Sequence, residues 1–161
     1  RQSFPRIDPA IIVLVTQGDA CLLGRNPRWP LKRFSTLAGF VEPGESLEDA
    51  VAREVYEETS VILTDIRYVS SQPWPFPASS RCGFYAEAAS RDMATSEELE
   101  ELRWFTPSQL TEAVLAGEVL LSPPVSIAFQ LLAGWFRAQG GGELESVYRE
   151  AREIRRAAAN S

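Results

Sequence analysis

Residues 39–61 read GFVEPGESLEDAVAREVYEETSV, and this stretch decides the fold of the chain. Its polar residues follow the spacing G-x5-E-x7-R-E-x2-E-E. The residues at the fixed positions are Gly39, Glu45, Arg53, Glu54, Glu57 and Glu58. At background residue frequencies, six such identities coincide by chance on the order of once in ten million placements. The spacing therefore indicates a functional motif, in preference to an acidic helix that merely faces solvent.

The motif is expected to be a loop followed by a helix. Residues 39–44 contain two glycines and Pro43, so they are predicted to form the loop. Ser46 is the predicted N-cap of the helix, and Asp49 follows it at capping-box spacing. The helix should continue to about Thr59.

The helix brings three carboxylates together. At about 100° per residue, Glu54, Glu57 and Glu58 lie within about 100° of arc. Carboxylates this crowded repel one another unless cations lie between them. Mg²⁺ and Mn²⁺ suit such a site, because they prefer oxygen ligands and leave room for water and phosphate. Arg53 is expected to orient Glu57, with a plain surface ion pair as the alternative.

The chain contains no histidine. This excludes a histidine general base and every zinc site that contains histidine. A hydrolase with this sequence must therefore use a carboxylate or a metal-activated water.

A second segment, residues 71–79, reads SQPWPFPAS. Its three alternating prolines remove backbone donors, which predicts an edge strand or a loop. In an extended chain, Gln72, Trp74 and Phe76 share one face and suit the stacking of a flat heterocycle. A linker or an SH3 ligand is the alternative, but the prolines do not form PxxP.

Taken together, these segments resemble a known family. Residues 39–61 resemble the Nudix box, and residues 71–79 resemble the SQPWPFPxS array of the NADH pyrophosphatase family. The resemblance extends from about Phe4 to about Gln139. It implies an α/β fold, the Nudix α/β/α sandwich around a mixed β-sheet.

The resemblance also implies the site residues. The implied catalytic residues are Glu57, Glu58 and Arg53. The implied metal ligands are the backbone carbonyl of Ala38 and the carboxylates of Glu54, Glu57, Glu58 and Glu98, with Glu101 as a rival for Glu98. The implied substrate-binding residues are Phe40, Gln72, Pro73, Trp74, Pro75, Phe76, Pro77, Ala78, Ser79 and Ala128. Arg81 departs from the family pattern, and either contacts a phosphate or faces solvent.

The implied reaction is metal-dependent hydrolysis of the pyrophosphate bond of NADH or NAD, with two or three Mg²⁺ or Mn²⁺ ions per site. The products are nicotinamide mononucleotide and AMP. One alternative is removal of the NAD cap from RNA 5′ ends, and another is hydrolysis of ADP-ribose or diadenosine substrates. A module that binds a dinucleotide without cleaving it is a further alternative, against which the intact glutamates argue.

Ser60 stands where the family usually has glycine. That glycine ends the helix, commonly with positive φ. Serine in this conformation should cost up to about 1 kcal/mol.

The rest of the chain predicts a mixed structure in one domain, residues 1–139. Strands are expected at residues 10–15, 21–25, 35–40, 61–72, 82–88 and 102–105, and helices at 46–59, 107–116 and 125–138. Residues 140–161 comprise a flexible glycine break and an amphipathic helix. We expect this helix to dock on its own domain, with a partner as the alternative.

Composition limits the possible partners and locations. The net charge of −6 argues against broad nucleic-acid binding, and no apolar run is long enough to span a membrane. Cys21 and Cys82 form no CxxC pair, so no zinc is expected in this chain. Family members usually carry a zinc ribbon before this region, so the chain is either a fragment or from a lineage without one. We expect a homodimer in a reducing intracellular compartment, first the cytoplasm, with an organelle left open.

Overall fold

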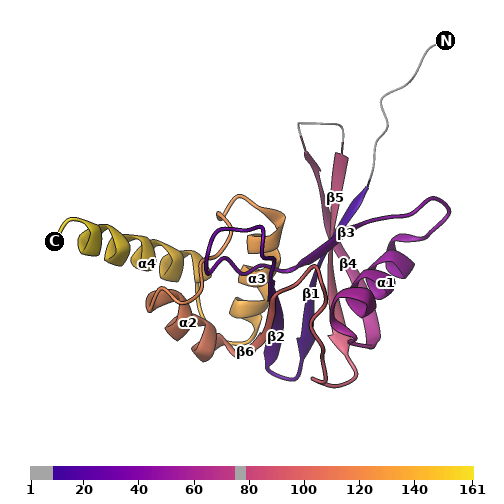
Figure 1. Ribbon diagram of the computed structural model, residues 1–161, viewed down its shortest axis with the longest axis horizontal. Coiled ribbons are helices and arrows are strands. Elements are labelled where there is room, and N and C mark those ends of the chain that lie inside the picture. The colour runs from indigo at the N-terminus through magenta and orange to yellow at the C-terminus, as the bar shows by residue number, and fades with distance from the viewer. Residues whose placement is uncertain (1–8, 75–78) are drawn as a thin grey trace, which may run out of the picture.

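The computed structural model describes residues 9–74 and 79–161, and the side chains of residues 70–74, 79 and 80 are left aside. Figure 1 shows a sheet with helices on either side of it. The strands are β1 (Ala10–Gln17), β2 (Ala20–Arg25), β3 (Leu37–Phe40), β4 (Leu63–Trp74), β5 (Ser79–Ala88) and β6 (Glu101–Phe105). The helices are α1 (Leu47–Thr59), α2 (Pro107–Leu115), α3 (Ile127–Ala138) and α4 (Leu144–Ala159).

The strands form one mixed sheet in the order β4-β5-β1-β2-β6, and β3 pairs with β1 outside this path. β1 runs parallel to β5 and antiparallel to β2 and β3. Gly18, in the turn between β1 and β2, has φ 62°, a conformation that glycine adopts without strain. β4 lies at one end of the sheet, so Pro73, near the end of β4, is in an edge strand, as the prolines predict.

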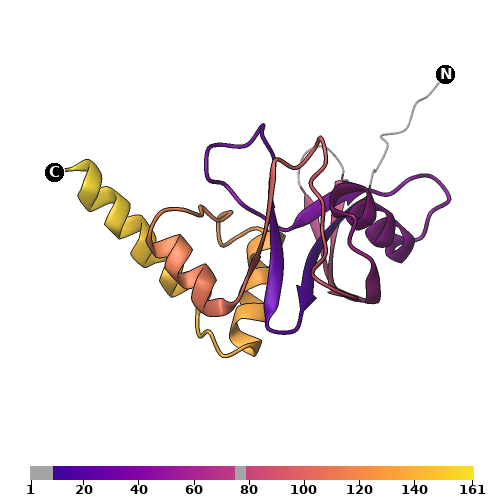
Figure 2. The same cartoon turned by 60° about the horizontal axis from the view of Figure 1, so that its bottom comes forward.

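The two faces of β1 explain the layers. Ile11 and Val13 pack with Val51 and Val55 of α1 in one apolar core. Ile12 points to the opposite face, where the core includes side chains of α3. Figures 1 and 2 show α1 on one side of the sheet and α2 and α3 on the other. The predicted α/β/α sandwich around a mixed sheet is confirmed.

Helix α1 begins and ends as local chemistry dictates. The Oγ of Ser46 accepts a hydrogen bond from the backbone N–H of Asp49 at 3.1 Å. Ser60 has φ 63°, and its N–H donates to the carbonyl of Tyr56 at 2.8 Å. The expected left-handed residue at position 60 is confirmed.

Helix α4 docks on its own domain. Leu144 and Ala151 are buried in the core that α3 lines, and the rings of Tyr148 and Phe129 meet edge to face at 5.7 Å between centroids. The outer part of α4 extends beyond α2 in Figure 1, and Ile154 there is 46% exposed. The division of the chain near residue 140 stays a prediction. No helix in the described part of the chain is long and apolar enough to cross a membrane.

Replacing Ser60 by glycine should stabilise the protein. Glycine removes the clash that a Cβ suffers at positive φ, which outweighs its greater entropy in the unfolded chain. Thermal unfolding of S60G should show a melting temperature raised by about 2–4 °C, as expected for about 1 kcal/mol in a domain of this size. Ser60→Val, with a branched Cβ, should lower it. A lower melting temperature for S60G would contradict this account.

Candidate active site

Strand β3 and helix α1 approach each other closely at Gly39. A Cβ at this position would lie 2.3 Å from Cδ and 2.6 Å from Oε2 of Glu54, so no other residue fits without moving that carboxylate. The pairing of β3 with β1 fixes Gly39 opposite Ile11. The first residue of the motif therefore makes room for the first of its helical carboxylates.

The guanidinium of Arg53 connects the loop, the strand and the helix. Its Nε and Nη2 donate to the two carboxylate oxygens of Glu45 at 2.7 and 2.9 Å. Nη1 donates to Glu54 at 2.9 Å, and Nη2 donates to the carbonyl of Phe40 at 3.0 Å. The expected contact with Glu57 is also present, and at 3.4 Å it is the longest of these hydrogen bonds. Arg53 thus holds Glu45 and Glu54 more closely than Glu57, which differs from the expected pairing.

The hydrogen bonds between Arg53 and Glu45 shift the pKa values of both groups. Hydrogen bonds from Arg53 lower the pKa of Glu45 to about 2, helped by the backbone N–H of Glu42. The bond to Glu45 in turn raises the pKa of Arg53. Both groups are ionised at neutral pH, so the bidentate pair is charge-assisted.

Three carboxylates converge beside this pair. Glu54, Glu58 and Glu98 each offer an oxygen, and these three atoms all lie within 4.8 Å of one another. Glu58 is only 7% exposed. Burial, hydrogen bonding with Glu98 and the charges of Glu54, Glu98 and Glu57 raise its pKa to about 8. Burial also raises the pKa of Glu54, against the opposing effect of Arg53.

This donor set fits a hard divalent cation. Oxygen ligands from carboxylates are what Mg²⁺ and Mn²⁺ prefer. A cation among the three carboxylates would offset both their mutual repulsion and the burial of Glu58. The groove they line is about 570 Å³ and is completed by residues 38–43, the end of β3 and the start of the loop after it, with Ala38 and Phe40 in its wall. Phe40 is 64% exposed, so its ring is available to a ligand.

The remaining predicted ligands lie at different distances from this cluster. The carboxylate of Glu57 is 58% exposed and is outside the group of three formed by the described residues. Glu98 lies in the cluster, whereas its rival Glu101 is in β6, with its carboxylate 4.0 Å from Arg103. The roles of these glutamates stay predictions.

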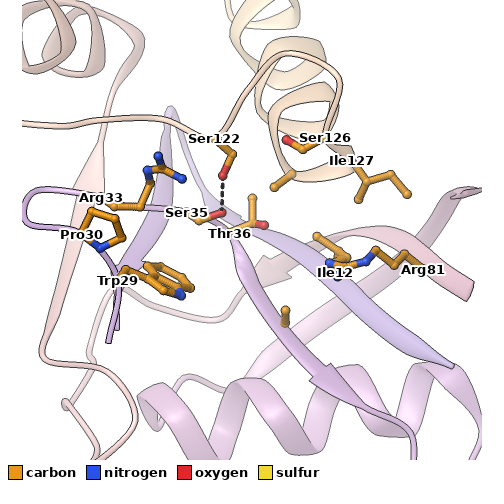
Figure 3. A pocket seen from close by; sticks show the side chains of 12 residues that line it. Ile12, Trp29, Pro30, Arg33, Ser35, Thr36, Arg81, Ser122, Ser126 and Ile127 are labelled. Atoms are coloured by element: carbon orange, nitrogen blue, oxygen red, sulfur yellow. Dashed lines mark hydrogen bonds between the residues drawn. The ribbon is translucent and has the colours of Figure 1, made fainter. Parts of the chain in front are cut away.

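A second cavity adjoins the groove, and Ala38 lines both. Figure 3 shows this cavity, of about 260 Å³, between the segment that carries Trp29 and Arg33 and the start of α3. Ala128 lines this second cavity. Arg81 also lines it, which favours ligand contact over a purely solvent-facing side chain.

Sequence reasoning missed Trp29 and Arg33, because residues 26–36 have no periodicity and match no motif. Only the basic residues of this loop, Arg28, Lys32 and Arg33, were a signal. It also missed Glu45 as the main partner of Arg53, although its fixed place in the motif was the available sign.

The predicted substrate-selecting segment is described only in part. The backbones of Gln72, Pro73, Trp74 and Ser79 lie in the edge hairpin, where Trp74 pairs with Ser79. Residues 75–78, which include the predicted Pro75, Phe76, Pro77 and Ala78, lie outside the described residues. The binding role of the whole segment stays a prediction.

Comparison with solved structures identifies the class of fold. A Nudix hydrolase from Nitrosomonas europaea aligns with a TM-score of 0.66 at 20% identity, covering 88% of this chain and 76% of that one. The Nudix domain of Shewanella oneidensis NrtR, solved in complex with ADP ribose, aligns with a TM-score of 0.64 at 17% identity, covering 84% and 90%. At such identities the likeness concerns the fold.

Sequence comparison identifies the family. A family profile described as NUDIX domain matches residues 6–122. The NAD-capped RNA hydrolase NUDT12 of Macaca fascicularis is 44% identical over 141 residues, which are 84% of this chain and 30% of that protein. The NAD-capped RNA hydrolase NudC of Pseudomonas putida (strain W619) is 53% identical over 110 residues, 68% of this chain and 40% of that protein. The chain belongs to the Nudix family, as residues 39–61 indicate, and spans less than half the length of these relatives.

Gly39→Ala tests the close approach of β3 and α1. The added Cβ must displace the Glu54 carboxylate, so Mn²⁺ affinity and any catalytic activity should fall at least tenfold. Isothermal titration with Mn²⁺ measures the affinity, and circular dichroism checks the fold. Unchanged Mn²⁺ affinity in a folded variant would contradict the assignment.

The raised pKa of Glu58 predicts how pH changes the effect of a cation. Its pKa in the folded protein, about 8, exceeds the ordinary glutamate value of 4.5, so its contribution to stability falls as pH rises between these values. Below pH 8 the carboxyl of Glu58 carries a proton, which Mg²⁺ must displace in order to bind. The rise in melting temperature caused by Mg²⁺, relative to chelator-treated protein, should therefore be larger at pH 8.5 than at pH 6. The difference should vanish in E58Q, and equal rises in the unmodified protein would contradict the prediction.

Proposed function

We propose that this chain hydrolyses the pyrophosphate bond of NADH or NAD to nicotinamide mononucleotide and AMP. The observation that carries the proposal is the convergence of Glu54, Glu58 and Glu98 in a groove walled by the exposed ring of Phe40. The groove combines a place for cations and phosphates with an apolar surface for a flat ring. The sequence likeness to NAD-capped RNA hydrolases supports a substrate that contains NAD.

Removal of the NAD cap from RNA is the second candidate function. It breaks the same bond, and it is the activity named for both relatives. A substrate that continues beyond the adenosine suits this groove, since Ala38, Phe40, Glu42 and Pro43 in its wall are exposed.

The acidic residues have separate tasks in this proposal. Glu54, Glu58 and Glu98, with the carbonyl of Ala38, would hold two or three Mg²⁺ or Mn²⁺ ions. When bound, such ions neutralise phosphate charge and lower the pKa of a coordinated water. Glu57 has the exposed carboxylate next to the cluster, which suits accepting a proton from the attacking water. Arg53 acts as a positioning residue, because it holds Glu54 and the loop.

Substrate recognition would use residues outside the acidic cluster. Phe40 would stack on the nicotinamide, and residues 72–79 would select the dinucleotide. The backbone around Ala128 would contact the substrate from the adjoining cavity, which that residue lines.

We further propose that the chain acts as a homodimer in a reducing intracellular compartment. The family resemblance supports the dimer. The two cysteines, Cys21 and Cys82, are both buried and unpaired, which suits a reducing environment. Light scattering coupled to size exclusion tests the dimer.

A panel of substrates tests the proposed reaction. With Mg²⁺ or Mn²⁺, the protein should convert NADH to nicotinamide mononucleotide and AMP, as read by product chromatography. Glu58→Gln and Glu57→Gln should each lower kcat a hundredfold or more, in line with loss of a ligand or a base. Glu48→Gln, which changes an exposed glutamate in the first turn of the same helix, should leave kcat unchanged.

Parallel reactions with NAD-capped RNA and ADP-ribose rank the alternatives. A higher kcat/KM for capped RNA than for NADH would favour decapping. No cleavage of any dinucleotide, or near-normal activity in both Glu57→Gln and Glu58→Gln, would contradict the proposal.

A further inference from the structure

The second cavity has a charge opposite to that of the groove beside it. Arg33 and Arg81 both line it, and none of the described residues that line it is acidic. The chain as a whole carries a net charge of −6, so a basic cavity is not a consequence of composition. Figure 3 shows the two arginines entering from opposite sides. The cavity is therefore suited to an anion.

Arg33 carries a side-chain donor that no acceptor in the described part of the chain satisfies. Its Nε is buried and has no hydrogen-bond acceptor in the described part of the chain, where its guanidinium also forms no ion pair. Its backbone N–H is held by the carbonyl of Pro30 at 3.1 Å, which fixes the start of the side chain. A buried donor without an acceptor is costly, and an anion that accepted from Arg33 would remove that cost.

Neutral donors line the same space. Ser126 is the N-cap of α3, so the positive end of this 12-residue helix lies at the cavity wall, beside Ile127 and Ala128. The hydroxyls of Ser35 and Ser122 lie 3.4 Å apart and both line the cavity. Such a set of guanidinium, hydroxyl and helix N-terminus is the chemistry that recognises phosphate.

Trp29 adds an aromatic wall. In Figure 3 its ring lies at the same edge of the cavity as Pro30, and its backbone N–H donates to the carbonyl of Asn26 at 3.0 Å. An indole in the wall of a cavity that an arginine also lines suits a phosphate that is attached to a sugar and base.

We propose that this cavity binds a phosphate ester carried on a ribose of the dinucleotide, with Arg33 as the specificity-determining contact. The inference rests on the proposed function, since Ala38 lines both spaces and a pyrophosphate in the groove would place a ribose near the cavity. Two substrates offer this chemistry, a dinucleotide phosphorylated on its adenosine ribose and a capped RNA with its first phosphodiester. Both carry a phosphate ester that NADH lacks.

Steady-state kinetics on three substrates test the proposal. The substrates are NADH, NADPH and an NAD-capped RNA dinucleotide, each with wild type, R33M, R33K and R28M. R33M should lose about tenfold in kcat/KM on the substrate whose phosphate occupies the cavity, and less than twofold on NADH. R33K should lose less than R33M. Arg28 is exposed and outside the cavity lining, so R28M is the matched control and should behave as wild type.

The pattern of losses identifies the source of the phosphate. A loss confined to NADPH assigns the cavity to a ribose phosphate of a free dinucleotide, and a loss confined to the capped RNA assigns it to the phosphodiester. Equal losses on all three substrates, or none on any, would overturn the proposal while leaving the proposed function intact.

A binding measurement separates this inference from the proposed reaction. Calorimetry in the presence of chelator compares adenosine 2′,5′-bisphosphate with AMP, and adenosine 3′,5′-bisphosphate with AMP. One bisphosphate should bind about tenfold more tightly than AMP to wild type, and the advantage should disappear in R33M. If the protein cleaves no dinucleotide, the proposed function fails, but tighter binding of one bisphosphate than of AMP would still support a phosphate site in the cavity. Equal binding of both bisphosphates and AMP to wild type would overturn it.

Discussion

Arg53 lies where the loop after β3, strand β3 itself and helix α1 meet, and its guanidinium donates to all three. It reaches Glu45 in the loop, the carbonyl of Phe40 at the end of the strand, and Glu54 on the helix. Arginine suits this position because its planar fork offers several donors in fixed directions, which lysine lacks. The positive charge also lies against carboxylates that would otherwise repel one another. The geometry of the acidic groove depends on this one side chain.

The helix that presents the carboxylates is also a layer of the core. Val51 and Val55 pack against β1, and Glu58 follows them at helical spacing on the same buried side of α1. Burial of this kind places Glu58 partly inside the protein and raises its pKa to about 8. The fold thus desolvates a carboxylate at a place where a cation would offset the cost, as is common at functional sites.

The ends of helix α1 and the spacing of its carboxylates could be predicted from the sequence, because they depend on interactions within a few residues. The N-cap at Ser46 and the left-handed Ser60 follow from steric and capping rules that act within a few residues. The spacing of Glu54 and Glu58 on one face follows from helix geometry. The partners of Arg53 were harder to predict from the sequence, because the loop conformation decides whether Glu45 or Glu57 is nearer. The basic cavity could not be predicted, since the fold brings Arg33 and Ala128 together from segments without a shared motif.

The central claim is that the protein positions Glu54, Glu58 and Glu98 to hold a divalent cation. Anomalous scattering from a crystal soaked in Mn²⁺ tests it most directly, because the signal locates the ion independently of activity. The account predicts a peak within coordination distance of carboxylate oxygens from all three residues. A Mn²⁺ ion bound elsewhere, with none of these carboxylates as a ligand, would contradict it.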